Sequence, residues 1–200
     1  MNLFTSPSVR SVQQSGALQV LAVGGAMLSD PVKSQLADSV QDLRKRKPTS
    51  PFFVQDKDIR GQAAEAYAAL TNEATRTTLV RELLSGDSTE RASCARIIGR
   101  FGDKSELELL LVLAGDTNDL VRHAALSGLT TLFVAGRETE AILKFLKRVL
   151  KSEGRRSGVA IVSALVNAPS KTPAVSHLLS IAEQNVSAQI RVMSREKAEG

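Results

Sequence analysis

This sequence of 200 amino acids contains few histidine and cysteine residues, the side chains that most often bind metals or act as nucleophiles. The two histidines, His123 and His177, lie far apart, and neither belongs to an HExxH motif or to a His-Glu pair at metal-ligand spacing. Cys94 is the only cysteine, which excludes an internal disulfide framework and a cysteine-based zinc cluster. The sequence contains no P-loop motif for binding phosphates. We therefore predict no catalytic residue, no cofactor and no metal site.

Basic side chains are the strongest chemical feature of the sequence. The formal net charge is +5, and residues 137–156 alone contain seven Lys or Arg against three Glu. Four of these basic residues recur at helical spacing, which would align them for contact with phosphates. The candidate binding surface consists of Lys144, Lys147, Arg148, Lys151, Arg155 and Arg156. The run Arg44–Lys47 forms a second basic patch. The alternative interpretation is that such a stripe is only the solvated face of a helix.

An internal repeat with a period of 31 residues indicates which helices would position these side chains. Arg60, Arg91 and Arg122 stand at equivalent places in three segments. Three residues after each arginine comes a small residue, seven after it a larger one, and ten after it a Leu or Phe. These spacings place the three positions on one face of a helix. The repeated segments are 56–70, 87–101 and 118–132.

Apolar periodicity, capping residues and glycines predict a succession of short helices. Aromatic residues make up only 4% of the chain, a composition that favours helices over sheets. Residues 159–166 are rich in β-branched side chains, yet we expect a helix there because no partner strand is present. The predicted helices are 11–28, 31–46, 58–70, 74–84, 88–101, 105–114, 119–134, 138–151, 155–167, 172–183 and 187–197.

The repeated segments resemble HEAT-like repeats of the phycobilisome-lyase type. The resemblance lies in an acidic or amide residue, an aliphatic-Arg pair, then Ala and a closing Leu, as in Asp56, Ile59-Arg60, Ala63-Ala64 and Leu70. It is clear from 56 to 134, and it weakens in the next unit, where Ser152 and Val159 replace Asp and Ala. The resemblance implies an all-α, armadillo-like fold: an α-solenoid of about five stacked helical hairpins.

The same resemblance implies a domain organisation and a role for the repeated arginines. Residues 1–55 are expected to form an N-terminal helical region with a basic run and a Pro-containing loop, and residues 56–200 a single continuous solenoid domain of HEAT-like repeats. The arginines Arg60, Arg91 and Arg122 are expected to form a structural ladder of ion pairs and hydrogen bonds to turn carbonyls. Direct contact of these arginines with a ligand is the alternative.

Repeats of this kind serve many functions, so the fold alone does not decide the activity. We expect a non-enzymatic scaffold that binds a protein partner through its solenoid surface. The first alternative is a nucleic-acid-binding HEAT-like protein that uses the basic face. The second is a phycobilin lyase-type subunit, because that activity leaves no simple motif. The His-Glu iron ligands of HEAT-type hydroxylases are missing, as is the Trp of HEAT-like DNA glycosylases.

The sequence predicts no membrane span, because no stretch reaches the roughly 20 apolar residues that crossing a bilayer requires. The most apolar stretch, Ala17–Leu28, can be read as a signal-peptide core or as an internal helix. The segment before it carries Arg10 as its only basic residue, which makes a poor signal-peptide start. We therefore expect an internal helix and a cytoplasmic protein. The sequence indicates no oligomeric state.

Overall fold

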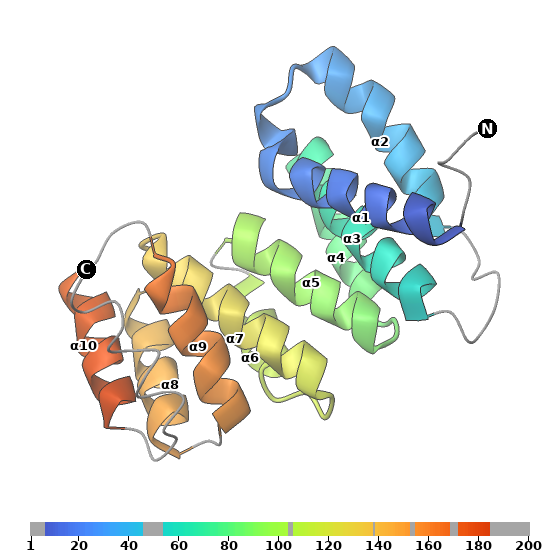
Figure 1. The fold of residues 1–200 in the computed structure, drawn as a ribbon. Helices are drawn as coiled ribbons and strands as arrows, with labels where there is room; N and C mark the ends of the chain where they lie inside the picture. The colour runs from blue at the N-terminus through green and yellow to red at the C-terminus, as the bar shows by residue number, and fades with distance from the viewer. Residues whose placement is uncertain are drawn as a thin grey trace. The chain divides into compact units, whose positions relative to one another are not determined.

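The computed structural model describes residues 7–45, 54–103, 106–137, 139–152, 155–168 and 172–184, with the side chains of 7–13, 54–58, 139, 152, 155 and 156 excepted. This part of the chain is all helical, without a strand, and the predicted all-α class is confirmed (Figure 1). The helices are α1 (Pro7–Gly24), η1 (Gly25–Met27), α2 (Asp30–Lys45), α3 (Val54–Leu70), α4 (Glu73–Leu84), α5 (Ser88–Phe101), α6 (Leu107–Leu113), α7 (Asp119–Val134), α8 (Thr139–Ser152), α9 (Arg155–Val166) and α10 (Pro173–Glu183).

The helix ends follow the predicted boundaries closely, because capping side chains fix several of them. Asn72, Asn118 and Thr172 each accept a hydrogen bond from a backbone N–H in the first turn of the helix that follows. The β-branched segment in α9 is helical, as expected. The largest differences are of four residues: α3 begins at Val54 and α1 at Pro7, each four residues before the predicted start, and α1 ends at Gly24, four residues before the predicted end. The predicted helix 187–197 lies outside the described residues.

The chain divides into two compact units, Met1–Cys94 and Ala95–Gly200. This division falls within α5, whereas the sequence predicted a boundary between residues 55 and 56. The difference arises because α1 and α2 pack directly on α3, the first helix of the expected repeat region. The N-terminal helices therefore share a core with the first repeat.

The core of the first unit forms where α1 and α2 meet α3. Leu18 and Ala22 of α1 and Val40 of α2 are buried together with Ala63 and Ala66 of α3. The small side chains of α3 let the neighbouring helices approach closely, while the larger Leu and Val side chains fill the remaining space. Cys94, which occupies the same repeat position as Ala63, is fully buried, and its thiol lies 3.6 Å from the Val80 carbonyl oxygen.

The second unit pairs helices that are two apart in the chain. The helix α7 packs against α9, and α8 packs against α10, while α7 also contacts both α6 and α8. Its buried side chains include Leu129 of α7, Leu146 of α8, Ile161 of α9 and Leu178 of α10. Contacts between alternate helices and between consecutive helices together make a repeat-like arrangement of packed helix pairs.

Glycine allows two helices of the second unit to touch through their backbones. A Cβ atom added to Gly99 of α5 would lie 2.4 Å from the Cα atom of Gly128 in α7. A Cβ atom added to Gly128 would lie 2.9 Å from the Ala95 carbonyl oxygen. Backbone atoms cannot move aside as the end of a flexible side chain can, so either addition would force the two helices apart.

The glycines at the helix ends are needed for different reasons. Among the described glycines, only Gly136 has a positive φ, at 75°. Gly102 is required for a steric reason instead, because a Cβ atom there would lie 2.4 Å from the Ile98 carbonyl oxygen. Arg137 then donates a hydrogen bond of 2.6 Å to the Gly102 carbonyl oxygen, which ties two turns of the second unit together.

We predict that Gly99→Ala lowers the free energy of unfolding by about 2 kcal/mol, because the methyl group overpacks the contact between α5 and α7. Gly16→Ala is the matched control, since a Cβ atom at Gly16 would meet nothing within 4 Å. The control is expected to raise the free energy by about 0.5–1 kcal/mol through helix propensity. Urea titrations followed by circular dichroism measure both changes. Equal stability of the Gly99 variant and the wild type would contradict the packing described.

Candidate interaction surfaces

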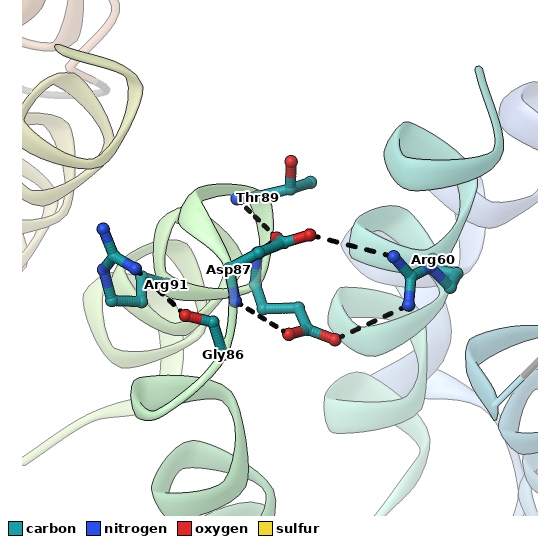
Figure 2. Close-up of polar contacts among 6 residues, drawn as sticks. Arg60, Gly86, Asp87, Thr89 and Arg91 are labelled. Atoms are coloured by element: carbon teal, nitrogen blue, oxygen red, sulfur yellow. Dashed lines mark hydrogen bonds and ion pairs between the residues drawn. The ribbon is translucent and has the colours of Figure 1, made fainter. Parts of the chain in front are cut away.

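The first arginine of the repeat lies within a compact polar cluster at the start of α5. The side chain of Asp87 accepts hydrogen bonds of 2.9 and 3.1 Å from the backbone N–H groups of Thr89 and Glu90. In return, Glu90 accepts a bond of 3.0 Å from the Asp87 N–H, which completes a reciprocal capping arrangement. The guanidinium of Arg60 lies 3.8 Å from the remaining oxygen of each carboxylate. Figure 2 shows Arg60 facing Asp87 from the neighbouring helix α3.

The other two repeat arginines bind turn carbonyls. Arg91 donates a hydrogen bond of 3.0 Å to the Gly86 carbonyl oxygen (Figure 2). Arg122 donates bonds of 2.7 and 2.9 Å to the carbonyl oxygens of Asp116 and Thr117, and it also pairs with Asp119. These contacts give each guanidinium a role in holding the turn that precedes its own helix. The choice between a structural role and direct contact with a ligand stays a prediction.

The basic candidate surface lies along the exposed side of α8. Lys144, Arg148 and Lys151 are exposed and Lys147 is half-buried, whereas Ile142, Leu146, Val149 and Leu150 are buried on the opposite side. The guanidinium of Arg148 lies 5.1 Å from the ring centre of Phe145. Arg155 and Arg156 are in the first turn of α9, and their side chains lie outside the described residues. The structure thus arranges three exposed cations along a single helix.

Of the second basic patch, Arg44 and Lys45 lie among the described residues. Arg44 is 10% exposed, and its guanidinium lies 3.0 Å from Glu82 of α4 and 5.9 Å from the ring centre of Tyr67. It borders an open cavity of about 340 Å³ that Gln41 and Thr78 also line. Lys45 is exposed, and Arg46 and Lys47 lie outside the described residues. Arg44 therefore serves packing within the first unit and does not contribute a free charge to a basic patch.

An exposed apolar face on α1 and η1 was not predicted from the sequence. Val20, Val23 and Met27 are 71%, 73% and 91% exposed, and they follow one another at spacings of three and four residues. Gly16, four residues before Val20, is also exposed. We call these four residues the α1 face. Isolated exposed apolar side chains are common, but a contiguous stripe of them is typical of an interaction site.

The apolar face was missed because the stretch Ala17–Leu28 is apolar nearly all round. Periodicity therefore did not reveal which side packs inward. The structure buries Leu18, Ala22 and Gly25 against α3 and leaves the opposite side uncovered. One sequence feature indicates the face: no charged residue occurs from Ser11 to Ser29, although a helix exposed to water usually carries charges on its outer side.

The structure exposes both histidines, His123 and His177, and buries Cys94. Within the described ranges, no three residues among His, Cys, Asp and Glu form a group that could hold a metal ion. The described helices also include none that is long and apolar enough to cross a membrane.

Comparison with known proteins identifies no relative. No family model matches the chain, and neither a curated protein nor a solved structure matches it.

We predict that Asp87→Ala lowers the free energy of unfolding by about 1 kcal/mol, because two backbone N–H groups of α5 lose their acceptor. Asp87→Asn separates the cap from the ion pair, since Asn caps a helix as well as Asp but carries no charge for Arg60. We expect it to cost less than half as much, as partly exposed ion pairs contribute little. Thermal and urea unfolding measure the difference. A loss for Asn as large as that for Ala would show that the ion pair dominates.

Proposed function

We propose that this protein is a non-enzymatic helical-repeat scaffold of HEAT-like type, acting in the cytoplasm, which binds a protein partner. The observation that carries the proposal is the uncovered α1 face. Water in contact with Val20, Val23 and Met27 is energetically unfavourable, and a partner that covers these side chains removes that cost. Glycine at position 16 and Ala17 beside it leave room for another main chain to approach closely.

The surrounding structure supports a role in presenting this face. The helix α1 rests on α3 through Leu18 and Ala22, so the outward side chains are held on a packed support. Side chains that are held in place before binding lose less conformational freedom when a partner arrives. The repeat arginines meanwhile hold turns and helix starts, which leaves them engaged in the scaffold itself.

We predict that a partner captured from extracts of the native host is lost on Val20→Glu/Val23→Glu. Each substitution would place a carboxylate where the partner buries apolar surface. The control Ser39→Glu/Asp38→Ser alters an exposed part of the neighbouring helix α2 and is expected to leave capture unchanged. The measurement is affinity capture from nuclease-treated extract followed by mass spectrometry, with circular dichroism to confirm folding. Capture that is unaffected by the two glutamates would contradict the proposal.

Nucleic-acid binding is the second candidate, and the exposed row Lys144, Arg148 and Lys151 favours it. Phosphate contacts made by these cations would release bound counterions, so binding would weaken steeply with salt. Lys147 lies on the same side but is half-buried. This candidate uses a different unit of the protein from the α1 face, so the two candidates can be tested separately.

For this candidate we predict that Lys144→Glu/Lys147→Glu/Arg148→Glu/Lys151→Glu abolishes retention on a phosphocellulose or single-stranded DNA column at low salt. The Val20→Glu/Val23→Glu variant serves as the control and should elute like the wild type after allowance for its two added charges. Unchanged retention of the α8 variant would exclude nucleic-acid binding through α8.

A further inference from the structure

The first unit contains a cavity that the α1 face does not use. It has a volume of about 340 Å³ and is lined by residues of α2, α3 and α4. Both α2 and α4 pack on α3, so the walls of the cavity belong to one packed unit. Its lining includes Gln41 and Arg44 from α2, Tyr67 from α3, and Thr78, Leu79 and Glu82 from α4. The cavity therefore combines polar and apolar side chains.

An ion pair between Arg44 and Glu82 sets the charge of the cavity. The Nη1 atom of Arg44 lies 3.0 Å from Oε1 of Glu82. Only 10% of the Arg44 side chain is exposed, against 57% of the Glu82 side chain. An anionic ligand would have to compete with Glu82 for the guanidinium, and a cationic ligand would be repelled by Arg44. The pair therefore favours a ligand group that is polar and uncharged.

Two buried atoms of the lining side chains have no hydrogen-bond partner within the part of the chain that the structure describes. They are Nε of Arg44, a donor, and Oε1 of Gln41, an acceptor. A carboxamide supplies both partners, since its oxygen accepts hydrogen bonds and its NH2 group donates them. Because both atoms are buried, the ends of the two side chains must turn as the ligand enters, a rotamer change that is common at interfaces.

Apolar surface within the cavity suits the stem that carries such a carboxamide. Leu79 is only 2% exposed, and the ring of Tyr67 is half-buried with the Arg44 guanidinium 5.9 Å from its centre. Thr78 is exposed, and its hydroxyl, which donates to the Ala74 carbonyl oxygen at 3.1 Å, can still accept a hydrogen bond. The lining thus offers contacts to methylene groups as well as to polar atoms.

The size of the cavity indicates what kind of molecule carries the carboxamide. Sites that enclose a whole small molecule usually measure about 300–1,000 Å³. This cavity is near the lower limit and open to solvent, which suits one side chain of a larger molecule. We propose that it binds the glutamine side chain of a peptide segment of a protein partner, with the carboxamide between Gln41 and Arg44. The inference rests on the proposed function, which supplies a protein partner, and adds a second contact site to it.

Tyrosine fluorescence tests the inference on the purified protein. Tyr67 is the only tyrosine and the chain has no tryptophan, so this signal comes from the cavity alone. The probes are N-acetylglutamine N-methylamide and the corresponding glutamate and methionine compounds, which are charged or apolar but similar in length. We expect a saturable change with the glutamine compound, with a dissociation constant of about 1–10 mM and binding about tenfold weaker for the other two. Free N-acetyltyrosinamide corrects for collisional quenching.

Three results would overturn the inference. A change that shows no saturation up to about 100 mM, ten times the highest expected dissociation constant, would show that the cavity does not bind the side chain. Equal binding of the three compounds would assign the affinity to their shared backbone amides. Tighter binding of the glutamate compound would show a site for anions. Binding at the proposed place should also shift the NMR signals of the Arg44 Nε–H group and the Gln41 side-chain amide.

Glu82→Gln tests the role of the ion pair in this preference. The substitution leaves the Arg44 charge unneutralised, so the glutamate compound should now bind about threefold or more tightly than the glutamine compound. Asp38→Asn is the matched control, because it removes one negative charge from an exposed position of α2 outside the cavity lining. It should keep the wild-type preference, and circular dichroism confirms that both variants fold. A Glu82 variant that still prefers glutamine would contradict the stated geometry.

Failure of this inference is distinguishable from failure of the proposed function, because the titrations need no captured partner. If the glutamine compound does not bind but capture is lost on Val20→Glu/Val23→Glu, only the cavity inference fails. If the glutamine compound binds with the stated preference but capture does not depend on Val20 and Val23, the α1 face is excluded as the partner site and the cavity inference stands.

Discussion

Each helix of this protein is short enough that it depends on burying one side against a neighbour. Helices of 7 to 18 residues gain little stability from their own hydrogen bonds in water, so packing supplies most of it. The chain meets this constraint with a small residue where helices approach and a larger one beyond it, as Ala63 and Leu70 do in α3. The closest case is the contact between Gly99 and Gly128, where no side chain separates α5 from α7.

This constraint explains why the polar groups of the repeat are held in place. When helix ends lie in tight turns, their free backbone groups need nearby partners. Asp87 and Glu90 satisfy the start of α5, and Arg91 and Arg122 satisfy the carbonyl groups of the turns before their helices. The arginines that repeat every 31 residues therefore stabilise turns that the packing of short helices makes necessary. The helix α1 differs, since it buries one apolar side and leaves a second apolar side exposed.

Much of the fold could be predicted from the sequence because its signals are local. Asn118 and Thr172 cap helices where the sequence placed the helix starts, and the basic side of α8 is exposed because its opposite side is apolar. Features that depend on distant residues were not predictable in this way. Arg44 pairs with Glu82, which lies 38 positions later in the chain, and no local pattern links the two. The exposed side of α1 was hidden for a related reason, since only the position of α3 decides which of two apolar sides is covered.

The central claim is that the exposed side of α1 is an interface. Hydrogen exchange of the α1 amides, followed by mass spectrometry with and without the partner captured from the native host, examines it without altering any residue. Docking of a partner on the α1 face should suppress local opening of this helix, so exchange in α1 should slow when the partner is added, while exchange in α8 stays constant. Exchange in α1 that is rapid and unchanged by the partner would contradict the claim.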